Sequence, residues 1–260
     1  MTKSVGLLNG LQNPFAGVNN LRNSDYCAYV DGRLMHIIDA RPVSARSRLL
    51  HKAIRSFIGS PHYPCVGAKS VLNRATYRFG SYGRLASPAA TAGLAHDLCA
   101  FVAEMRSKRH AFCSYIAVFD DLDCREEALF ESALWQQLRG LRRLDQLFFP
   151  YDDFANSDPA SASYAFSFAS CAMFVVGLHP GSSRVARRFP WPALVFNPHD
   201  QFRALRAGGK YNTFKGVIRA REVKLQGSIN PNLSDFGEQS EARQYAGRAV
   251  DKDWKCPFVR

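Results

Sequence analysis

The sequence predicts an α+β fold, a single domain with a largely antiparallel sheet flanked by helices. Two long segments, residues 89–105 and 125–144, carry apolar residues at helical spacing. Short apolar runs of strand length lie between and after them, without the strict alternation of strand and helix that a parallel sheet requires. With 260 residues, 47% of them hydrophobic, the chain can bury one large core or two small ones.

The N-terminal part has mixed polarity over residues 1–45, and we expect these residues to lie against the surface. Residues 1–50 are therefore assigned to an N-terminal extension packed on a domain of residues 51–260. Apolar spacing, prolines and glycines then predict a helix over residues 49–57, a turn over 62–67, and a short strand or loop over 77–82.

The central part holds the two long helices and one strand. In residues 89–105 the spacing puts Leu94, Leu98 and Phe101 on one helix face. Residues 111–119 alternate in polarity and then become fully apolar, which predicts a strand that ends at Asp120 and Asp121. The second helix, residues 125–144, follows after a short connection.

The C-terminal part begins with three strands. Residues 164–168 and 172–178 are predicted to form a hairpin, and residues 193–196 form another strand. The last two strands each run into a turn that contains a proline and a histidine, His179 in the first and His199 in the second. Because functional residues concentrate on loops that a rigid scaffold positions, we expect a site at these strand ends.

His199 is predicted to open a helix. Asn197 is a good N-cap, Pro198 is tolerated at the first helical position, and Asp200 complements the helix dipole in the first turn. The helix should end before Gly208. Its positive N-terminal end disfavours an imidazolium, so His199 is expected to be neutral at pH 7, the state that can ligate a metal.

Five arginines lie close to the two histidines: Arg184, Arg187, Arg188, Arg203 and Arg206. The three that follow His179 are predicted to form the cationic face of a helix capped by Ser182 or Ser183, and the other two share a helix face with His199. Arginines beside neutral histidines indicate an anionic ligand with a metal at its centre. The alternative is that each histidine satisfies local backbone groups at a strand end.

The formal net charge of +12 raises nucleic-acid binding as an alternative function. However, the basic residues are spread along the chain, and it has no zinc-finger, helix-turn-helix or RNP-type motif. An acidic substrate, an acidic redox partner or a propionate-bearing cofactor explains the charge equally well. We therefore expect no nucleic-acid partner.

Other classes of protein find little support in the sequence. No apolar run reaches the roughly 20 residues that span a bilayer, and no secretory signal is apparent, so no membrane association and a cytoplasmic location are expected. The seven cysteines lack Cys-x-x-Cys spacing, which argues against a disulfide framework and a structural zinc site. Motifs of ordinary hydrolases, kinases and dehydrogenases are also missing.

Seven motifs resemble those of the YqcI/YcgG family, and the resemblance covers roughly residues 55–258. They are PCVGAK (64–69), FGSYG (79–83), FVVGLHPGSSRVARRF (174–189), LVFNPHDQF (194–202), LQGS (225–228), DFGEQSEARQY (235–245) and WKCPF (254–258). Residues 1–50 and the segment Ala169-Ser170-Cys171 are individual to this chain. The resemblance makes residues 51–260 a haem-binding catalytic domain.

The resemblance implies a haem-dependent N-oxygenase. Such an enzyme uses O2 and external electrons to oxidise an amino or guanidino nitrogen of a small cation, such as an arginine derivative or 2-aminoimidazole, in specialised metabolite biosynthesis. The implied cofactor is haem b with one axial protein ligand and an open face for O2. Because the chain carries no flavin or nicotinamide fingerprint, the electrons are expected from a separate reductase or ferredoxin.

The resemblance also suggests roles for residues around the two histidines. His199 is the expected axial ligand of the haem iron, and His179, Cys256 and Cys65 remain alternatives. Arg184, Arg187 and Arg188 are expected to bind the haem propionates through charge-assisted hydrogen bonds.

The expected catalytic residues at the substrate end are three acids, Asp235, Glu238 and Glu241. Glu238 and Glu241 are predicted to lie three residues apart on one helix face, where carboxylates could hold a planar guanidinium. The alternative is that Asp235 and Glu238 cap a helix.

Two other hypotheses stay open at this point. A non-catalytic haem carrier or sensor would use two axial protein ligands, such as His179 together with His199. A basic nucleic-acid-binding protein would bind no haem at all. The oligomeric state is also open, with a dimer as one alternative.

Overall fold

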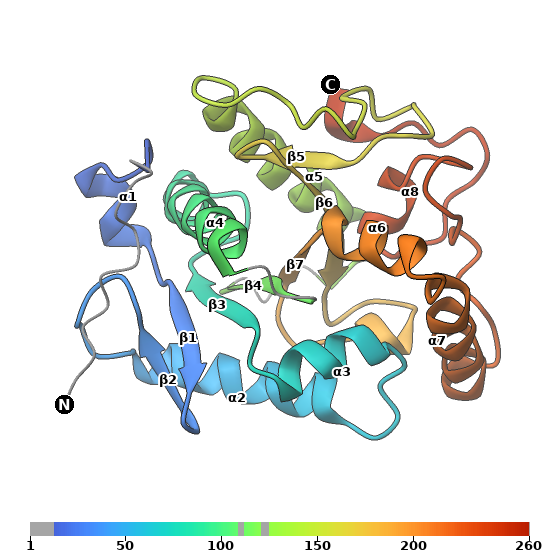
Figure 1. Ribbon diagram of the computed structural model, residues 1–260, viewed down its shortest axis with the longest axis horizontal. Helices are drawn as coiled ribbons and strands as arrows, with labels where there is room; N and C mark the ends of the chain where they lie inside the picture. Colours follow the sequence, from blue (N-terminus) through green and yellow to red (C-terminus); the bar gives the residue numbers. More distant parts are fainter. Residues whose placement is uncertain (1–12, 109–111, 121–124, 260) are drawn as a thin grey trace.

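One seven-stranded sheet organises the computed structural model, which describes residues 13–108, 112–120 and 125–259 (Figure 1). From one edge to the other, the strands are β2 (Arg33–His36), β1 (Cys27–Val30), β3 (Tyr77–Tyr82), β4 (Ser114–Phe119), β7 (Ala193–Pro198), β6 (Cys171–Leu178) and β5 (Phe166–Phe168). Neighbouring strands are antiparallel except for β3 and β4. The predicted α+β class with a largely antiparallel sheet is confirmed.

Helices lie on both faces of the sheet (Figure 1). In chain order the α-helices are α1 (Val18–Asn23), α2 (Ala45–Gly59), α3 (Val66–Asn73), α4 (Pro88–Lys108), α5 (Glu127–Asp145), α6 (His199–Ala207), α7 (Tyr211–Gln226) and α8 (Ala242–Tyr245). Two short 3-10 turns, Val185–Arg187 and Pro257–Val259, complete the regular structure of the described residues.

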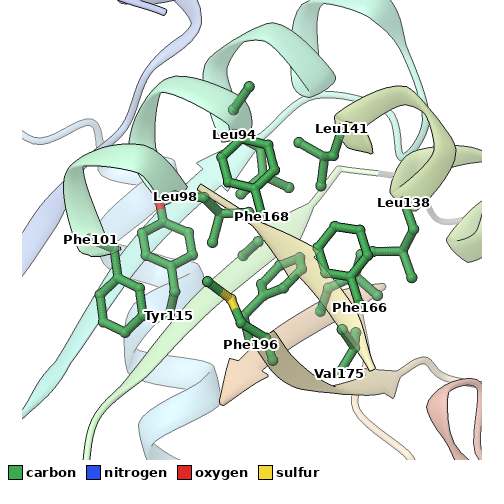
Figure 2. Packing of buried hydrophobic residues seen from close by; sticks show 14 of the residues in the cluster. Leu94, Leu98, Phe101, Tyr115, Leu138, Leu141, Phe166, Phe168, Val175 and Phe196 are labelled. Atoms are coloured by element: carbon green, nitrogen blue, oxygen red, sulfur yellow. The ribbon is translucent and has the colours of Figure 1, made fainter. Parts of the chain in front are cut away.

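The sheet separates two hydrophobic cores, because its strands alternate their side chains between the faces. On the central strand β4, Tyr115 and Phe119 enter the core formed with α4 and α5, while Ile116 and Val118 enter the core formed with α2 and α3. Figure 2 shows the first of these cores, where aromatic and leucine side chains interlock. A strand covered on both faces is apolar at every position, and all six residues of β4 are buried.

The long helices confirm the predicted ones. The segment 49–57 lies within α2 and the segment 89–105 within α4, and α5 covers nearly all of 125–144. The strand predicted over residues 111–119 begins at Ser114 in β4; Ala111 and Asp121 lie outside the described residues.

In the first 82 residues, the structure revises two predictions and resolves one that was left open. The turn expected over residues 62–67 stops earlier, because α3 begins at Val66, where the Cys65 Sγ accepts a hydrogen bond from the Ala68 N–H at 3.4 Å. The segment 77–82, left between strand and loop, is strand β3. Within residues 1–45, the hairpin β1–β2 extends the sheet by pairing with β3, so this part is more than a surface cover. The assigned division between residues 50 and 51 falls inside α2.

The predicted hairpin near residue 170 is confirmed, although β5 begins two residues later than predicted and β6 one residue earlier. Its two turn residues, Ala169 and Ser170, have φ angles of 50° and 53°. Glycine or asparagine usually occupies such positions. Here the turn is held from outside, because Asp145 accepts a hydrogen bond from the Ala169 N–H and Arg106 donates to both turn carbonyls.

Candidate functional site

A cavity of about 300 Å³ is lined by residues of strands β6 and β7, of helices α3, α6 and α7, and of the segment 230–244. Figure 1 shows how these elements are arranged. Five phenylalanines contribute to its wall: Phe112, Phe174, Phe202, Phe214 and Phe236. Its charged lining residues are Arg187, Arg206, Lys215, Arg219, Glu222, Asp235 and Glu241. A largely apolar cavity with a few charged groups is the usual form of a small-molecule or cofactor site.

His199 lines this cavity at the junction of β7 and α6. The helix begins at His199, as predicted, but Asn197 is not its N-cap. Asn197 still belongs to β7, and its side chain accepts a hydrogen bond from the Ser114 hydroxyl at 2.7 Å and donates to the Phe174 carbonyl. The Asn197 side chain therefore bonds to residues of the neighbouring strands β4 and β6, and it does not cap the helix as the sequence pattern predicted.

The two ring nitrogens of His199 have different surroundings. Nε2 lies 3.2 Å from Oε1 and 3.0 Å from Oε2 of Glu241, while Nδ1 is buried and has no hydrogen-bond partner among the described residues. The imidazole as a whole is only 4% exposed. An ionised Glu241 accepts the Nε2 hydrogen, which leaves the lone pair on Nδ1.

This arrangement is typical of a histidine that binds a metal. Buried polar atoms without a partner are rare in folded proteins and call for an explanation such as a missing ligand. A metal-ligating histidine usually donates its other ring N–H to a carboxylate, which fixes the tautomer and the ring orientation. The rings of Phe236, Phe154 and Phe202 surround the imidazole at centroid distances of 5.0, 5.6 and 5.9 Å. His199 therefore fits the role of ligand to a metal-centred cofactor.

Glu241 is the only one of the three predicted acids that contacts His199 among the described residues. It is 2% exposed, and burial raises the pKa of its carboxyl, with the hydrogen bonds from His199 and Tyr245 acting in the opposite direction. The Tyr245 hydroxyl donates to Oε1 and itself accepts from the Phe166 N–H at 2.9 Å. Glu241 is thus held by His199 and by Tyr245, and Tyr245 is itself bonded to the edge strand β5.

The helix face expected to carry Glu238 and Glu241 does not exist. The only helix in this segment, α8, spans four residues after Glu241, and Glu238 lies in the preceding turn, where it is exposed. Glu238 accepts a hydrogen bond from the Asp235 N–H at 2.9 Å, a local capping contact, and it does not line the cavity. The prediction of one acidic clamp from both glutamates is therefore wrong.

Asp235 does line the cavity, in an ion pair with Lys215. The Tyr211 hydroxyl lies 3.4 Å from its other oxygen. Burial acts to raise the pKa of Asp235, but the hydrogen bond and charge of Lys215 outweigh it and hold the pKa below its ordinary value. Asp235 is thus an ionised acid at the cavity wall, already paired with a cation.

The segment after His179 also differs from its prediction. Instead of a capped helix it forms the three-residue 3-10 turn Val185–Arg187, and the Ser182 hydroxyl only accepts from the Arg184 N–H at 3.2 Å. His179 is fully buried, stacks on Phe130 with ring centroids 4.3 Å apart, and does not line the cavity. The structure therefore separates the two histidines.

The three arginines of this segment point to different partners and form no common cationic face. Arg184 is 7% exposed and pairs with Glu222 at 2.6 Å, while the exposed Arg188 donates to the Ser182 carbonyl. Arg187 alone lines the cavity. It donates to the carbonyls of Gly177 and Tyr245, and burial lowers its pKa to about 10.

Arg187 is a cation without a carboxylate partner among the described residues. Its guanidinium is half-buried at the cavity wall, so it can form charge-assisted hydrogen bonds with an anionic group in the cavity.

The two alternative cysteine ligands also differ in position. Cys65 lines the cavity, whereas Cys256 packs against the core of α4 and α5 and does not. Burial raises the pKa of both thiols, that of Cys256 to about 12. Neither environment favours a thiolate.

Helix α7 was missing from the sequence prediction, and it supplies six of the cavity residues that the prediction lacks: Tyr211, Phe214, Lys215, Ile218, Arg219 and Glu222. Of these, Glu222 pairs with Arg184. The uninterrupted run between Gly209 and Gly227 is the signal that could have predicted this helix. Arg206, which was predicted to share the face of His199, does line the cavity.

The sequence model of the YqcI/YcgG family matches residues 54–259. No curated protein and no solved structure matches the chain. Within the described residues, no helix is both long and apolar enough to cross a membrane.

Proposed function

The chain belongs to the YqcI/YcgG family, and on this premise we propose that it is a haem-dependent N-oxygenase. The proposed substrate is a small cation whose amino or guanidino nitrogen is oxidised, such as an arginine derivative or 2-aminoimidazole. The co-substrate is O2, and the electrons come from a separate reductase or ferredoxin.

The observation that carries the proposal is the buried, unpartnered Nδ1 of His199 at the wall of the cavity. Glu241 holds the other ring nitrogen, so the chain presents an oriented lone pair rather than a freely rotating imidazole. Among the described residues that line the cavity, His199 is the one histidine. These facts favour His199 over His179 as axial ligand, and favour one protein ligand over the two that a carrier or sensor would use.

Two further groups suit a bound haem b. Arg187 offers a propionate a guanidinium whose hydrogen bonds go to backbone carbonyls, and the phenylalanine rings of the wall suit the apolar macrocycle. When bound, haem would supply an iron that activates O2 with electrons from the donor. The chain's own part is to ligate the iron, bind the propionates and exclude water around the reacting nitrogen.

Asp235 is the best-placed acid for a cationic substrate. It is ionised, lies at the wall of the cavity and forms an ion pair with Lys215. A planar guanidinium could take the place of the Lys215 ammonium and donate two parallel hydrogen bonds to the carboxylate. Glu222 and Glu241 already serve Arg184 and His199. We therefore assign substrate binding to Asp235 and ligand orientation to Glu241.

The test is the absorption spectrum of protein produced with added haem precursor, in the ferric, reduced and CO-bound states. A Soret band with a histidine-type CO complex is expected. His199→Ala should lose the bound haem, whereas His62→Ala, a change at an exposed histidine outside the cavity, should retain it.

Two results would contradict the proposal. Failure to bind haem after reconstitution would show that haem is not the cofactor. Retention of a normal spectrum by His199→Ala would show that His199 is not the iron ligand. Turnover is then tested with arginine and 2-aminoimidazole, O2 and a reductant, where the product should gain oxygen and Asp235→Asn should raise KM.

A further inference from the structure

Three potential metal ligands of different chemistry meet at the start of the β1–β2 hairpin. They are the Asp25 carboxylate, the Cys27 thiol and the His36 imidazole, and their ligand atoms all lie within 4.8 Å of one another. The hairpin register creates the cluster, because Cys27 and His36 are direct cross-strand partners and Asp25 precedes Cys27 by two residues. None of the three lines the cavity that contains His199.

The distances within the cluster suit a tetrahedral zinc ion. Typical zinc bond lengths to sulfur, nitrogen and oxygen imply separations of roughly 3.3–3.6 Å between neighbouring ligand atoms. In the structure, Cys27 Sγ lies 3.6 Å from His36 Nδ1 and 3.8 Å from Asp25 Oδ1. His36 Nε2 lies 3.3 Å from the same Oδ1. A small rotation of the imidazole would place one of its nitrogens where it could bind the same zinc ion as the thiol and the carboxylate.

The cluster is buried and its carboxylate is already oriented. Cys27 is fully buried, and the side chains of His36 and Asp25 are 5% and 12% exposed. Asp25 Oδ2 accepts hydrogen bonds from the Ser81 N–H at 2.9 Å and from the hydroxyls of Ser81 and Ser47 at 2.8 Å. These bonds aim Oδ1 at the thiol and the imidazole, as the supporting hydrogen bonds of a metal-bound carboxylate do.

We propose that Asp25, Cys27 and His36 bind a zinc ion, with water as the fourth ligand. One sulfur, one nitrogen and one oxygen form a donor set that suits zinc better than the hard ions Mg²⁺ and Ca²⁺. On binding, the thiol proton is released to solvent and the thiolate coordinates the metal.

The zinc ion would fasten the N-terminal hairpin to the rest of the molecule. Asp25 connects to α2 through Ser47, to β3 through Ser81, and to α4 through its own N–H, which donates to Asp97 at 2.9 Å. The ligands precede residue 54, where the match to the family begins, so the inference is independent of the proposed oxygenase activity.

The first test is zinc content and zinc X-ray absorption of the full-length, tag-free protein after incubation with Zn²⁺ and desalting. One tightly bound zinc ion per chain is expected, with one sulfur neighbour at about 2.3 Å and the remaining neighbours nitrogen or oxygen. Absence of zinc, or a zinc spectrum without sulfur, would overturn the proposal. Iron in a bound haem does not affect this measurement.

Variants then locate the site. Cys27→Ala and His36→Gln should each reduce zinc from near one to near zero per chain, while Cys99→Ala, at another buried cysteine outside the cluster, should leave it unchanged. A chelator should lower the Tm of the wild type and of Cys99→Ala, but not of the other two. Unchanged zinc in both cluster variants would place the ion elsewhere. If Cys27→Ala does not fold, the zinc content of His36→Gln and the zinc X-ray absorption spectrum of the wild type test the proposal.

Discussion

At the scale of single residues, the pKa values of two carboxyls, those of Asp145 and Glu104, shift in opposite directions. Burial raises the pKa of Asp145 from its ordinary value of 3.8 to about 6, although Arg142 and the Ala169 N–H partly offset this. Burial also acts to raise the pKa of Glu104, but hydrogen bonds and charges from Arg78 and Lys108 lower it to about 2. The difference depends on how many cations reach each buried group.

Asp145 should make the protein less stable as the pH rises from about 4 to 6. In this window the folded chain retains a proton that the unfolded chain has lost, so the free energy of unfolding falls with pH, by on the order of 2–3 kcal/mol for this group. Asp145→Asn keeps the acceptor for the Ala169 N–H but cannot ionise. Urea unfolding of both proteins at pH 4, 5, 6 and 7 measures the effect. Parallel pH profiles for the two would mean that Asp145 titrates at its ordinary pKa.

At the scale of elements, the candidate site is assembled by the junction of a strand and a helix with two segments from later in the chain. The end of β7 presents His199, α7 brings Lys215 and Glu222, and the turn before α8 brings Glu241. Close approach of elements is possible where glycine removes a side chain. A Cβ at Gly67 of α3, for example, would lie 2.9 Å from the Phe214 ring of α7.

Two helical glycines should respond oppositely to alanine. A Cβ at Gly93 in α4 would overlap the carbonyl oxygen of Asn23 at the end of α1, so Gly93→Ala should cost about 1–3 kcal/mol. Gly216 in α7 has open space around it, so Gly216→Ala should gain about 0.5–1 kcal/mol from helix propensity. Free energies of unfolding in urea measure both. Equal effects of the two substitutions would show that the contact between α1 and α4 is not tight.

At the scale of the whole molecule, the formal charge of +12 produces a field that attracts anionic partners. The arginines near the cavity are mostly engaged: Arg184 with Glu222, Arg203 with Asp200, and Arg206 over the Tyr211 ring at 4.3 Å. The net charge therefore acts through long-range attraction of anionic partners and not through one binding patch.

Electron transfer from an acidic ferredoxin to the haem-loaded protein should depend on salt. Because exposed charges are screened beyond about 8–10 Å near physiological ionic strength, the reduction rate should fall about tenfold or more between low and high NaCl. Photochemical reduction by a small uncharged donor is the control and should change little. A salt-independent rate with ferredoxin would mean that net charge does not steer this partner. Stopped-flow absorbance of the Soret band follows both reactions.

Much of the fold follows from local sequence patterns. The apolar spacing of residues 89–105 and 125–144 predicted α4 and α5, and the apolar runs near residues 175 and 195 predicted β6 and β7. These patterns can be recognised in the sequence because the residues on one face of a helix or of a strand recur at a fixed period along the chain. The hairpin β1–β2 was missed because its strands are only four residues long and β2 carries the polar residues Arg33 and His36.

The sequence by itself determined the α+β class, the helix that starts at His199, and the motifs that identify the family. The tertiary structure alone decided that His199 faces Glu241, that His179 is stacked away from the cavity, and that Cys27 meets His36. The reason is physical. Helix and strand preferences act between near neighbours in the chain, whereas pairs such as His199 and Glu241, 42 residues apart, depend on how the elements pack.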